Sequence, residues 1–483
     1  MSLLTRVPSR VIGGALAAIG PCHTRHVRAA AASFAIVLAS GRLAAADTIR
    51  DIVVEGNTKT TTDTVELIAK VAVGDDWTSD MLDRIKADLV SSGLFKDVDG
   101  FWDACGPASS PRCDEPGVRV HLTVKDKHSW VIAPAFYNQP TNTGGGIGFG
   151  ENNLFGENQK LLLYGQIATG DSFFIGAWVI PAIGGTRFYA QLDTYLKTAR
   201  VIEYAPPTGY TDNPSAVRQS RMNYLNGGVK LGIELFRGVK LDARLRGAHV
   251  SYRDVKALTL DLGAITTDPT ASLTNPPKPG QEGWDISNEI SLTIDRRANW
   301  YGIQSGYKYQ TSVEYAIPKL GSDFHYYLFN LSLYKAVQVL ERHNLVAKAG
   351  VHVGHDLPFQ QELTMGGTAM RGYLNNQFRG DLHVGGTVEY SLPLFTIAGL
   401  SVRGLGFFDS GYTTFIDASN DERNYLPGAA RGATSTLAPF KNSVGVGTRL
   451  YLRQIVLPLL GLDFGYGLEA RDLQVYLAIG LTD

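Results

Sequence analysis

The residues with the clearest chemical potential are an arginine and an aspartate. Arg371 stands in the glycine-rich stretch GGTAMRGYLNNQFRGD, and Asp409 stands in the aromatic stretch GLGFFDSGY. A guanidinium and a carboxylate form strong charge-assisted hydrogen bonds, and an arginine withdrawn from water needs such a partner. The pair predicts an ionic clasp between a loop and a strand. Taken alone, each residue is equally compatible with an ordinary solvated position.

Catalytic motifs are missing from the sequence. It contains no GxSxG, no HExxH, no GK[ST], and no GxGxxG in a strand-turn-helix setting. The stretch GGGIGFG precedes a predicted strand, which argues against phosphate binding. His352 and His355 lie close to a turn and have too few partners for a metal site. We therefore expect no enzymatic activity, no cofactor and no metal.

Composition narrows the class of protein. The 483 residues carry a net charge of -1 and 53 glycines. A nucleic-acid partner would require a basic surplus, so none is expected. No uninterrupted apolar run reaches the length of about 18 residues that a membrane-spanning helix needs. If the chain spans a membrane, it must do so as a β-barrel, whose strands alternate in polarity.

The first 46 residues resemble a targeting segment. They contain no acidic residue, carry Arg25 and Arg28, and continue into the apolar run AAAASFAIVLAS and the small residues before Asp47. This pattern predicts a signal peptide over residues 1–46, cleaved after Ala46, and hence export. An organelle transit peptide is the alternative.

Two cysteines remain after the predicted leader. Cys105 and Cys113 bracket the short loop CGPASSPRC. In an exported chain this spacing predicts a disulfide that staples the loop locally.

Residues 47–127 predict a small α+β domain of order β-α-α-β-β. A strand ending in VEGN precedes two segments with helical apolar spacing. SGLFKDV joins the second helix to a strand, and DVDGFWDA and VRVHLTVKD supply the last two strands. This order and its punctuation resemble a single POTRA (polypeptide-transport-associated) domain. A generic small α+β domain is the alternative.

From Trp130 to the end the apolar period becomes two, as in the stretches VKLDARLRG, GGVKLGIEL, NLVAKAGVHVG and LQVYLAIGL. The alternating segments run to about nine to eleven residues, the length a tilted strand needs to cross a bilayer. A soluble β-sandwich also alternates, but over shorter strands. Residues 128–483 thus predict an outer-membrane β-barrel of about 16 antiparallel strands, with a loop around residues 360–381 folded inward.

The ordered motifs resemble the BamA/TamA-type outer-membrane assembly and translocation family, which combines POTRA domains with a surface-antigen-type barrel. GGGIGFGENNLFGENQKLLLYGQ is similar to that family's first barrel hairpin, MRGY to its inward loop, and FFDSG to its acid-bearing strand. The resemblance implies a loop lock made of Gly366, Gly367, Arg371, Gly372 and Tyr373 and a wall partner made of Asp409 and Gly411. Two features depart from the family pattern: Gly406 replaces a frequent aromatic residue, and the chain ends in AIGLTD rather than in an aromatic residue.

The resemblance implies a protein that captures unfolded clients through its POTRA edge and inserts or transports them through the barrel. The expected partners are the outer-membrane bilayer and unfolded barrel or secreted clients, with the chain itself a monomer. The expected location is the bacterial outer membrane with the POTRA domain in the periplasm, or alternatively an organelle outer membrane. A dedicated secretion pore for one client and a passive porin are the competing functions.

Overall fold

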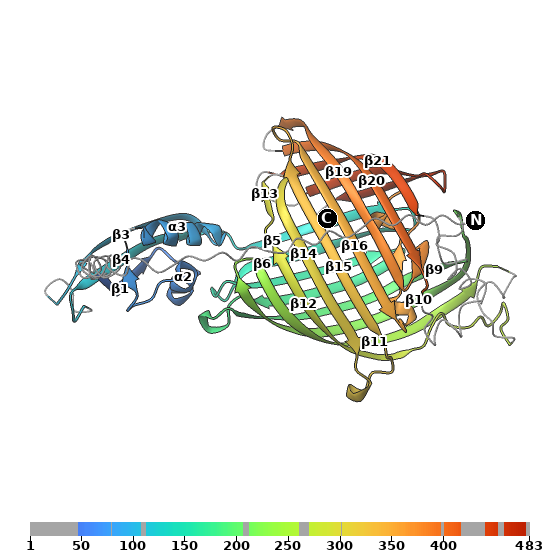
Figure 1. Cartoon of the computed structure of the whole chain (residues 1–483), viewed down its shortest axis with the longest axis horizontal. Coiled ribbons are helices and arrows are strands. Elements are labelled where there is room, and N and C mark those ends of the chain that lie inside the picture. Colours follow the sequence, from blue (N-terminus) through green and yellow to red (C-terminus); the bar gives the residue numbers. More distant parts are fainter. Residues whose placement is uncertain are drawn as a thin grey trace, which may run out of the picture.

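The chain folds into a small α+β domain and a β-barrel that the domain adjoins at one end (Figure 1). The predicted signal peptide, residues 1–46, lies outside the described residues. The computed structural model describes residues 47–78, 80–107, 113–205, 212–259, 270–300, 302–397, 400–416, 440–452 and 458–479.

The small domain has the predicted order with one short strand added between the helices. Its elements are β1 (Asp47–Glu55), α2 (Thr62–Ala69), β2 (Asp76–Trp77), α3 (Met81–Ser91), β3 (Phe95–Cys105) and β4 (Gly117–Asp126). The sheet order is β2-β1-β4-β3, in which β1 and β4 run parallel and β3 and β4 antiparallel. The domain is therefore POTRA-like.

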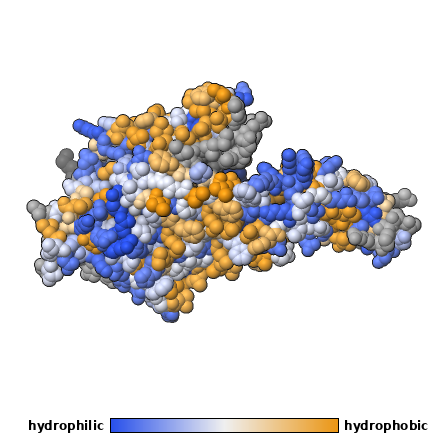
Figure 2. Space-filling model, turned by 180° about the vertical axis from the view of Figure 1, so that it is seen from behind, coloured by the Kyte–Doolittle hydropathy of each residue, from blue (hydrophilic) through white to orange (hydrophobic). Residues whose placement is uncertain are grey.

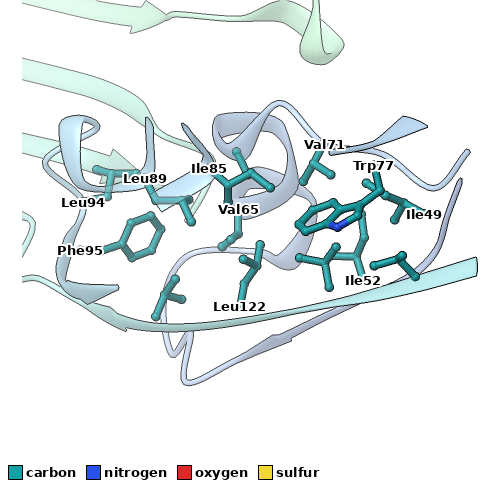
Figure 3. Close-up of a cluster of buried hydrophobic side chains, with 14 residues drawn as sticks. Ile49, Ile52, Val65, Val71, Trp77, Ile85, Leu89, Leu94, Phe95 and Leu122 are labelled. Carbon is teal, nitrogen blue, oxygen red and sulfur yellow. The ribbon is translucent and has the colours of Figure 1, made fainter. Parts of the chain in front are cut away.

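Alternation along β4 builds the core of this domain (Figure 3). Val120 and Leu122 are fully buried beneath the helices, which contribute Val65, Ile85 and Leu89. The two helices thus cover the apolar face of the sheet, which is how a two-layer domain keeps its core away from water.

The strand β3 forms one edge of the small sheet, and the two-residue β2 lies at the other. At the end of β3, Cys105 is disulfide-bonded to Cys113, so the bond closes the loop between β3 and β4. The strand β3 also presents Phe101, 57% exposed, and Trp102, 45% exposed. The aromatic side chains thus lie on a strand that has a partner on only one side.

Sixteen long antiparallel strands form the closed barrel, and the three-residue β13 (Ala298–Trp300) pairs with β14 beside them. They are β5 (Trp130–Gln139), β6 (Asn142–Leu154), β7 (Gln159–Ala168), β8 (Asp171–Ile180), β9 (Phe188–Ala205), β10 (Ser215–Phe236), β11 (Val239–Ala257), β12 (Gly283–Asp295), β14 (Ile303–Ala316), β15 (Tyr327–Gln338), β16 (Asn344–His355), β19 (Leu382–Ile397), β20 (Leu400–Thr414), β21 (Lys441–Leu452), β22 (Pro458–Gly467) and β23 (Asp472–Ile479). Pairing of β23 with β5 closes the ring.

Barrel strands carry apolar residues outward and polar residues inward. On β11, Leu241 and Leu245 are 40% and 48% exposed, whereas Asp242 and Arg246 are buried. Hydrophobic side chains accordingly cover much of the visible barrel surface (Figure 2). Several strands are longer than the nine to eleven residues predicted, and β10 reaches 22. Such strands exceed what the hydrocarbon layer requires, so they continue beyond it.

The loop before α2 contacts the barrel and is itself held within the small domain by Asp126, the last residue of β4. Asp126 Oδ2 accepts the backbone N–H groups of Thr58 and Lys59, both at 2.6 Å, and Oδ1 accepts the Thr60 hydroxyl at 2.5 Å. Partial burial raises the pKa of Asp126, but these hydrogen bonds outweigh it and hold the pKa below its usual value.

The fastened loop then contacts the β6-β7 hairpin. Thr61 N–H donates to the Gly156 carbonyl at 3.0 Å, and Lys59 Nζ lies 2.8 Å from Glu151 Oε2. A Cβ at Gly156 would come within 2.1 Å of the Lys59 carbonyl oxygen, so this close approach requires glycine. The small domain thus meets the barrel through a defined set of polar contacts.

Candidate functional site: a plug latched inside the barrel

The segment between β16 and β19 folds into the barrel and forms what we call the plug, residues 356–381. It contains η4 (Phe359–Gln361), β17 (Leu363–Met365), η5 (Gly367–Ala369) and β18 (Phe378–Gly380). β17 and β18 pair as a small hairpin. Met365, Met370 and Arg371 of the plug line a lumen cavity of about 640 Å³ together with side chains of the barrel wall.

Arg371 is held by Asp409 of β20. Its Nε lies 2.9 Å from Oδ2 and its Nη2 lies 2.8 Å from Oδ1, while the Arg371 backbone N–H donates to Oδ2 at 3.1 Å. The two residues are 5% and 1% exposed. This forked pairing fixes both the position and the orientation of the guanidinium.

Two further acids complete the pairing. Arg371 Nη1 lies 2.8 Å from Glu389 Oε1 and 3.3 Å from Asp463 Oδ2. Asp463 is shared with Arg449, whose Nη1 approaches Oδ1 to 2.5 Å. Three carboxylates, on β19, β20 and β22, therefore surround two guanidinium groups, so both buried cations have anionic partners.

An aromatic ring supports the same guanidinium. The Arg371 Cζ lies 3.4 Å from the centroid of Phe407, a stacking geometry that favours arginine. Phe407 is two residues before Asp409 on β20 and so points to the same side of the strand. Gly406, the residue that departs from the family pattern, is three positions before Asp409 and therefore lies on the opposite face of β20.

Three of the plug glycines have backbone conformations that other residues rarely adopt. Gly366, Gly367 and Gly372 have φ of +124°, +68° and +91°. At Gly372 a Cβ would also come within 2.5 Å of the Gly467 backbone nitrogen. Glycine therefore lets the plug lie directly against β22.

Tyr373 and the plug methionines form a buried cluster. Tyr373 is 1% exposed and packs with Met365, Met370 and Phe378. Its hydroxyl lies 3.2 Å from the Asn442 carbonyl oxygen and also contacts the Glu469 carboxylate.

The wall glycine opposite this cluster has a matching role. A Cβ at Gly411 would lie 2.5 Å from the Met365 sulfur and 3.2 Å from the Met370 sulfur. Gly411, two residues after Asp409, thus leaves room for the two methionines.

The plug tip also reaches the first and last strands of the barrel. Tyr476 on β23 accepts the Gly372 N–H at 3.1 Å and donates to the Tyr373 carbonyl at 2.9 Å. Asn375 Nδ2 lies 3.2 Å from Gln139 Oε1 on β5. One plug therefore contacts both strands that meet where the ring closes.

Every residue of the predicted lock lies at this site, but the sequence argument omitted several neighbours. Glu389, Asp463, Phe407 and Tyr476 were not singled out. Asp463 has a recognisable signal, because it is an acid on the inward period of the otherwise apolar stretch LLGLDFGYG. Glu389 lies in an ordinary mixed stretch and has no comparable signal.

The described residues contain no group of three or more His, Cys, Asp and Glu side chains arranged to hold an ion. His352 lies beside His383 at a ring separation of 5.7 Å, and its Nδ1 is 2.8 Å from Asn330 Oδ1.

Within the ranges described, no helix combines the length and apolar character of a membrane span.

Residues 153–479 match the Omp85 superfamily domain. The fold is similar to that of BamA from Haemophilus ducreyi lacking POTRA domains 1-3, with a TM-score of 0.62, 13% identity, and coverage of 90% of this chain and 84% of that one. It is also similar to CdiB from Acinetobacter baumannii, with a TM-score of 0.57, 14% identity, and coverage of 90% and 74%. No curated protein matches the sequence.

The family match covers most of the barrel, including β7 to β23 and the whole plug. Both structural likenesses extend to a barrel preceded by a small domain and support the fold alone at this identity. Proteins of this superfamily are non-enzymatic outer-membrane barrels, so the match identifies an outer-membrane barrel and not an enzyme. The chain belongs to the Omp85 superfamily.

Proposed function

We propose that this protein is an outer-membrane assembly or translocation factor. Its POTRA domain captures unfolded clients, and its barrel inserts them into the membrane or passes them across it. The observation that carries the proposal is a plug whose tip is hydrogen-bonded to both strands of the barrel closure, β5 and β23.

The POTRA edge supplies a place for capture. Because β3 is an edge strand of its sheet, its free side can accept a client strand by β-augmentation. The exposed rings of Phe101 and Trp102 offer apolar contacts to the side chains of such a strand.

The barrel closure supplies a place for insertion. Among the described residues, β23 and β5 share three register pairs, from Leu477 with Asn138 to Ile479 with Phe136. An unpaired strand edge in lipid is costly, so β5 and β23, once parted, would pair readily with a client strand instead.

The plug links the lumen to this closure. Its tip binds Tyr476 on β23 and Gln139 on β5, so loss of the plug removes contacts from both sides of the closure. Binding of a client at the closure and departure of the plug are therefore coupled events.

A disulfide across the closure tests the insertion step. Tyr137→Cys with Ala478→Cys joins a register pair of β5 and β23, and Leu462→Cys with Leu477→Cys joins β22 and β23 as a matched control. In proteoliposomes, we expect oxidation of the closure pair to abolish folding of an added unfolded barrel protein, with recovery on reduction. Full insertion by the oxidised closure pair would exclude this mechanism.

A second candidate function is secretion of one dedicated client through the lumen. The plug lies within that lumen, so its departure would widen a path without parting the closure. In this case the oxidised closure pair still exports its client, and only variants of the plug change export. A passive porin would instead show steady conductance that does not rise in Arg371→Ala.

Client capture is tested by photocrosslinking in the full chain. A photoreactive residue at Phe101 on β3 should capture unfolded barrel proteins, whereas one at the exposed Val90 of α3 should capture few. Equal capture at the two positions would mean that the sheet edge is not the binding site.

A further inference from the structure

The plug has a second ionic attachment, distinct from the one made by Arg371. Arg379 lies on β18 at what we call the root of the plug, where the chain enters from β16 and leaves to β19. It is 6% exposed. Its Nη1 is 2.5 Å from Glu362 Oε2 within the plug, and its Nη2 is 3.3 Å from Glu203 Oε1 on β9.

Glu203 is in turn fixed by the barrel wall. Arg218 of β10 donates to it from Nε at 2.5 Å and from Nη2 at 2.7 Å. The remaining guanidinium nitrogen of Arg218, Nη1, donates to the Pro277 carbonyl oxygen at 2.9 Å. Glu203 and Arg218 are 3% and 0% exposed, so this wall pair is assembled out of water.

The charges of this cluster balance. Two guanidinium groups, Arg218 and Arg379, face two carboxylates, Glu203 and Glu362. Glu203 accepts from both arginines and so connects the plug to the wall. Because buried charges of this kind are costly when unpaired, the contact between Arg379 and Glu203 favours the plug in its inward position.

Apolar and amide contacts hold the root against the same wall. Phe359 packs edge-on against Tyr252 of β11 at 5.8 Å, and the Arg379 Cζ lies 5.0 Å from the Phe359 centroid. Gln361 Nε2 lies 2.9 Å from Asp285 Oδ2 on β12. The side chains of the root therefore reach β9, β11 and β12, while β17 and β18 themselves lie against β20.

The two attachments lie on opposite sides of the ring. Asp409 is on β20 and Glu203 is on β9, and seven long strands separate them in either direction, namely β21, β22, β23, β5, β6, β7 and β8 one way and β10, β11, β12, β14, β15, β16 and β19 the other. The ionic contacts of the plug thus span the lumen like a bar, while its backbone at Asp381 is also hydrogen-bonded to β16 and β20.

We propose that Arg379, Glu203 and Arg218 form a second latch, and that the plug leaves the lumen only when both latches open. The Arg371 latch holds the tip near the closure, whereas the second latch holds the root on the opposite wall. Breaking the tip latch alone leaves the bar anchored across the lumen. This inference concerns the attachment of the plug and does not depend on the client.

Single-channel recording of the full chain in planar bilayers tests the proposal as a double-mutant cycle. Arg371→Ala and Glu203→Gln should each raise the opening frequency roughly tenfold or more, the effect of losing a charge-assisted hydrogen bond. Because the latches are separate, the two factors should multiply in the combined variant. Arg371→Ala with Asp409→Ala, which breaks one latch twice, should not exceed the larger single effect.

Arg379→Gln provides a second way to break the root latch, from the plug rather than the wall. It should reproduce Glu203→Gln, and it carries the test if the wall variant fails to form a heat-modifiable barrel. A Thr368→Cys reporter, which is exposed toward the cavity, should become reactive to a bulky thiol reagent only in the doubly unlatched protein. If neither root variant adds to Arg371→Ala in either measurement, the second latch is refuted.

Discussion

The POTRA-like domain and the barrel use the same two-residue alternation with opposite polarity. On β4 the apolar residues Val120 and Leu122 are fully buried, whereas on β11 Leu241 and Leu245 face outward. The interior of the barrel instead contains charged side chains such as Arg246, which is 5% exposed. The comparison teaches that alternation specifies a strand with two unlike faces, and the surrounding solvent selects which face is turned inward.

The largest expected effect comes from placing one cation on each apolar face. Leu122→Arg buries an unpaired charge in the POTRA core and should cost more than about 4 kcal/mol, enough to unfold that domain. Leu245→Arg faces lipid and should cost about 2–4 kcal/mol if it lies near the bilayer midplane. Limited proteolysis of the full chain reports on the first, and barrel mobility on unheated gels reports on the second. A POTRA domain that tolerates Leu122→Arg would contradict the comparison.

The interior charges provide the converse test. Arg246 lies 3.1 Å from Asp285 and 2.7 Å from Glu314, and Arg246→Met would leave both acids without this partner at a cost of about 3–5 kcal/mol. In the POTRA domain Arg119 pairs with Asp51 at 2.9 Å in a more exposed position, so Arg119→Met should cost about 1–3 kcal/mol. Urea unfolding followed separately for each region measures the two losses. Equal losses would show that the barrel interior is as well hydrated as the domain surface.

The disulfide should matter to one region only. Replacing Cys105 and Cys113 by serine removes a short cross-link and should destabilise the POTRA domain by about 2–3 kcal/mol, with the barrel unchanged. Reduction of the unmodified protein should give the same shift in POTRA proteolysis. A barrel that becomes heat-labile on reduction would mean that the regions fold as one unit.

The smallest effect concerns the joint between the regions. The pKa of Asp126 is lowered in the folded protein, so its stabilising contribution is present above the unfolded value and is lost as pH falls through the folded one. Spin labels at Val73 and Ile167 should give a narrow distance distribution at neutral pH that broadens below about pH 4. Asp126→Asn should broaden it at neutral pH. The exposed control Asp97→Asn should not, and a change there would point to general unfolding.

The sequence anticipated the class of each region because its signals are local. Period-two runs predicted the barrel of 16 strands, and helical spacing between strands predicted the β-α-α-β-β domain. The predicted partners Arg371 and Asp409 meet in the structure, as do Cys105 and Cys113. The functional role of the lock stays a prediction.

Other features of the site carried little or no local signal. Glu389 and Arg379 look like ordinary charged residues in their own stretches. Glu203 lies 176 positions from Arg379, the plug arginine that it contacts. Strand ends were also misjudged, because alternation continues where a strand leaves the membrane and gives no mark of the hydrocarbon boundary.

The sequence by itself determined which residues alternate, which glycines permit a tight inward turn, and which arginine and aspartate stand apart in a glycine-rich and an aromatic stretch. Only the tertiary structure decided that β9 and β20 face each other across the lumen and that one loop is fastened to both. The physical reason is closure: joining β23 to β5 curves the sheet into a ring, and the ring alone brings strands distant in sequence within reach of a single plug.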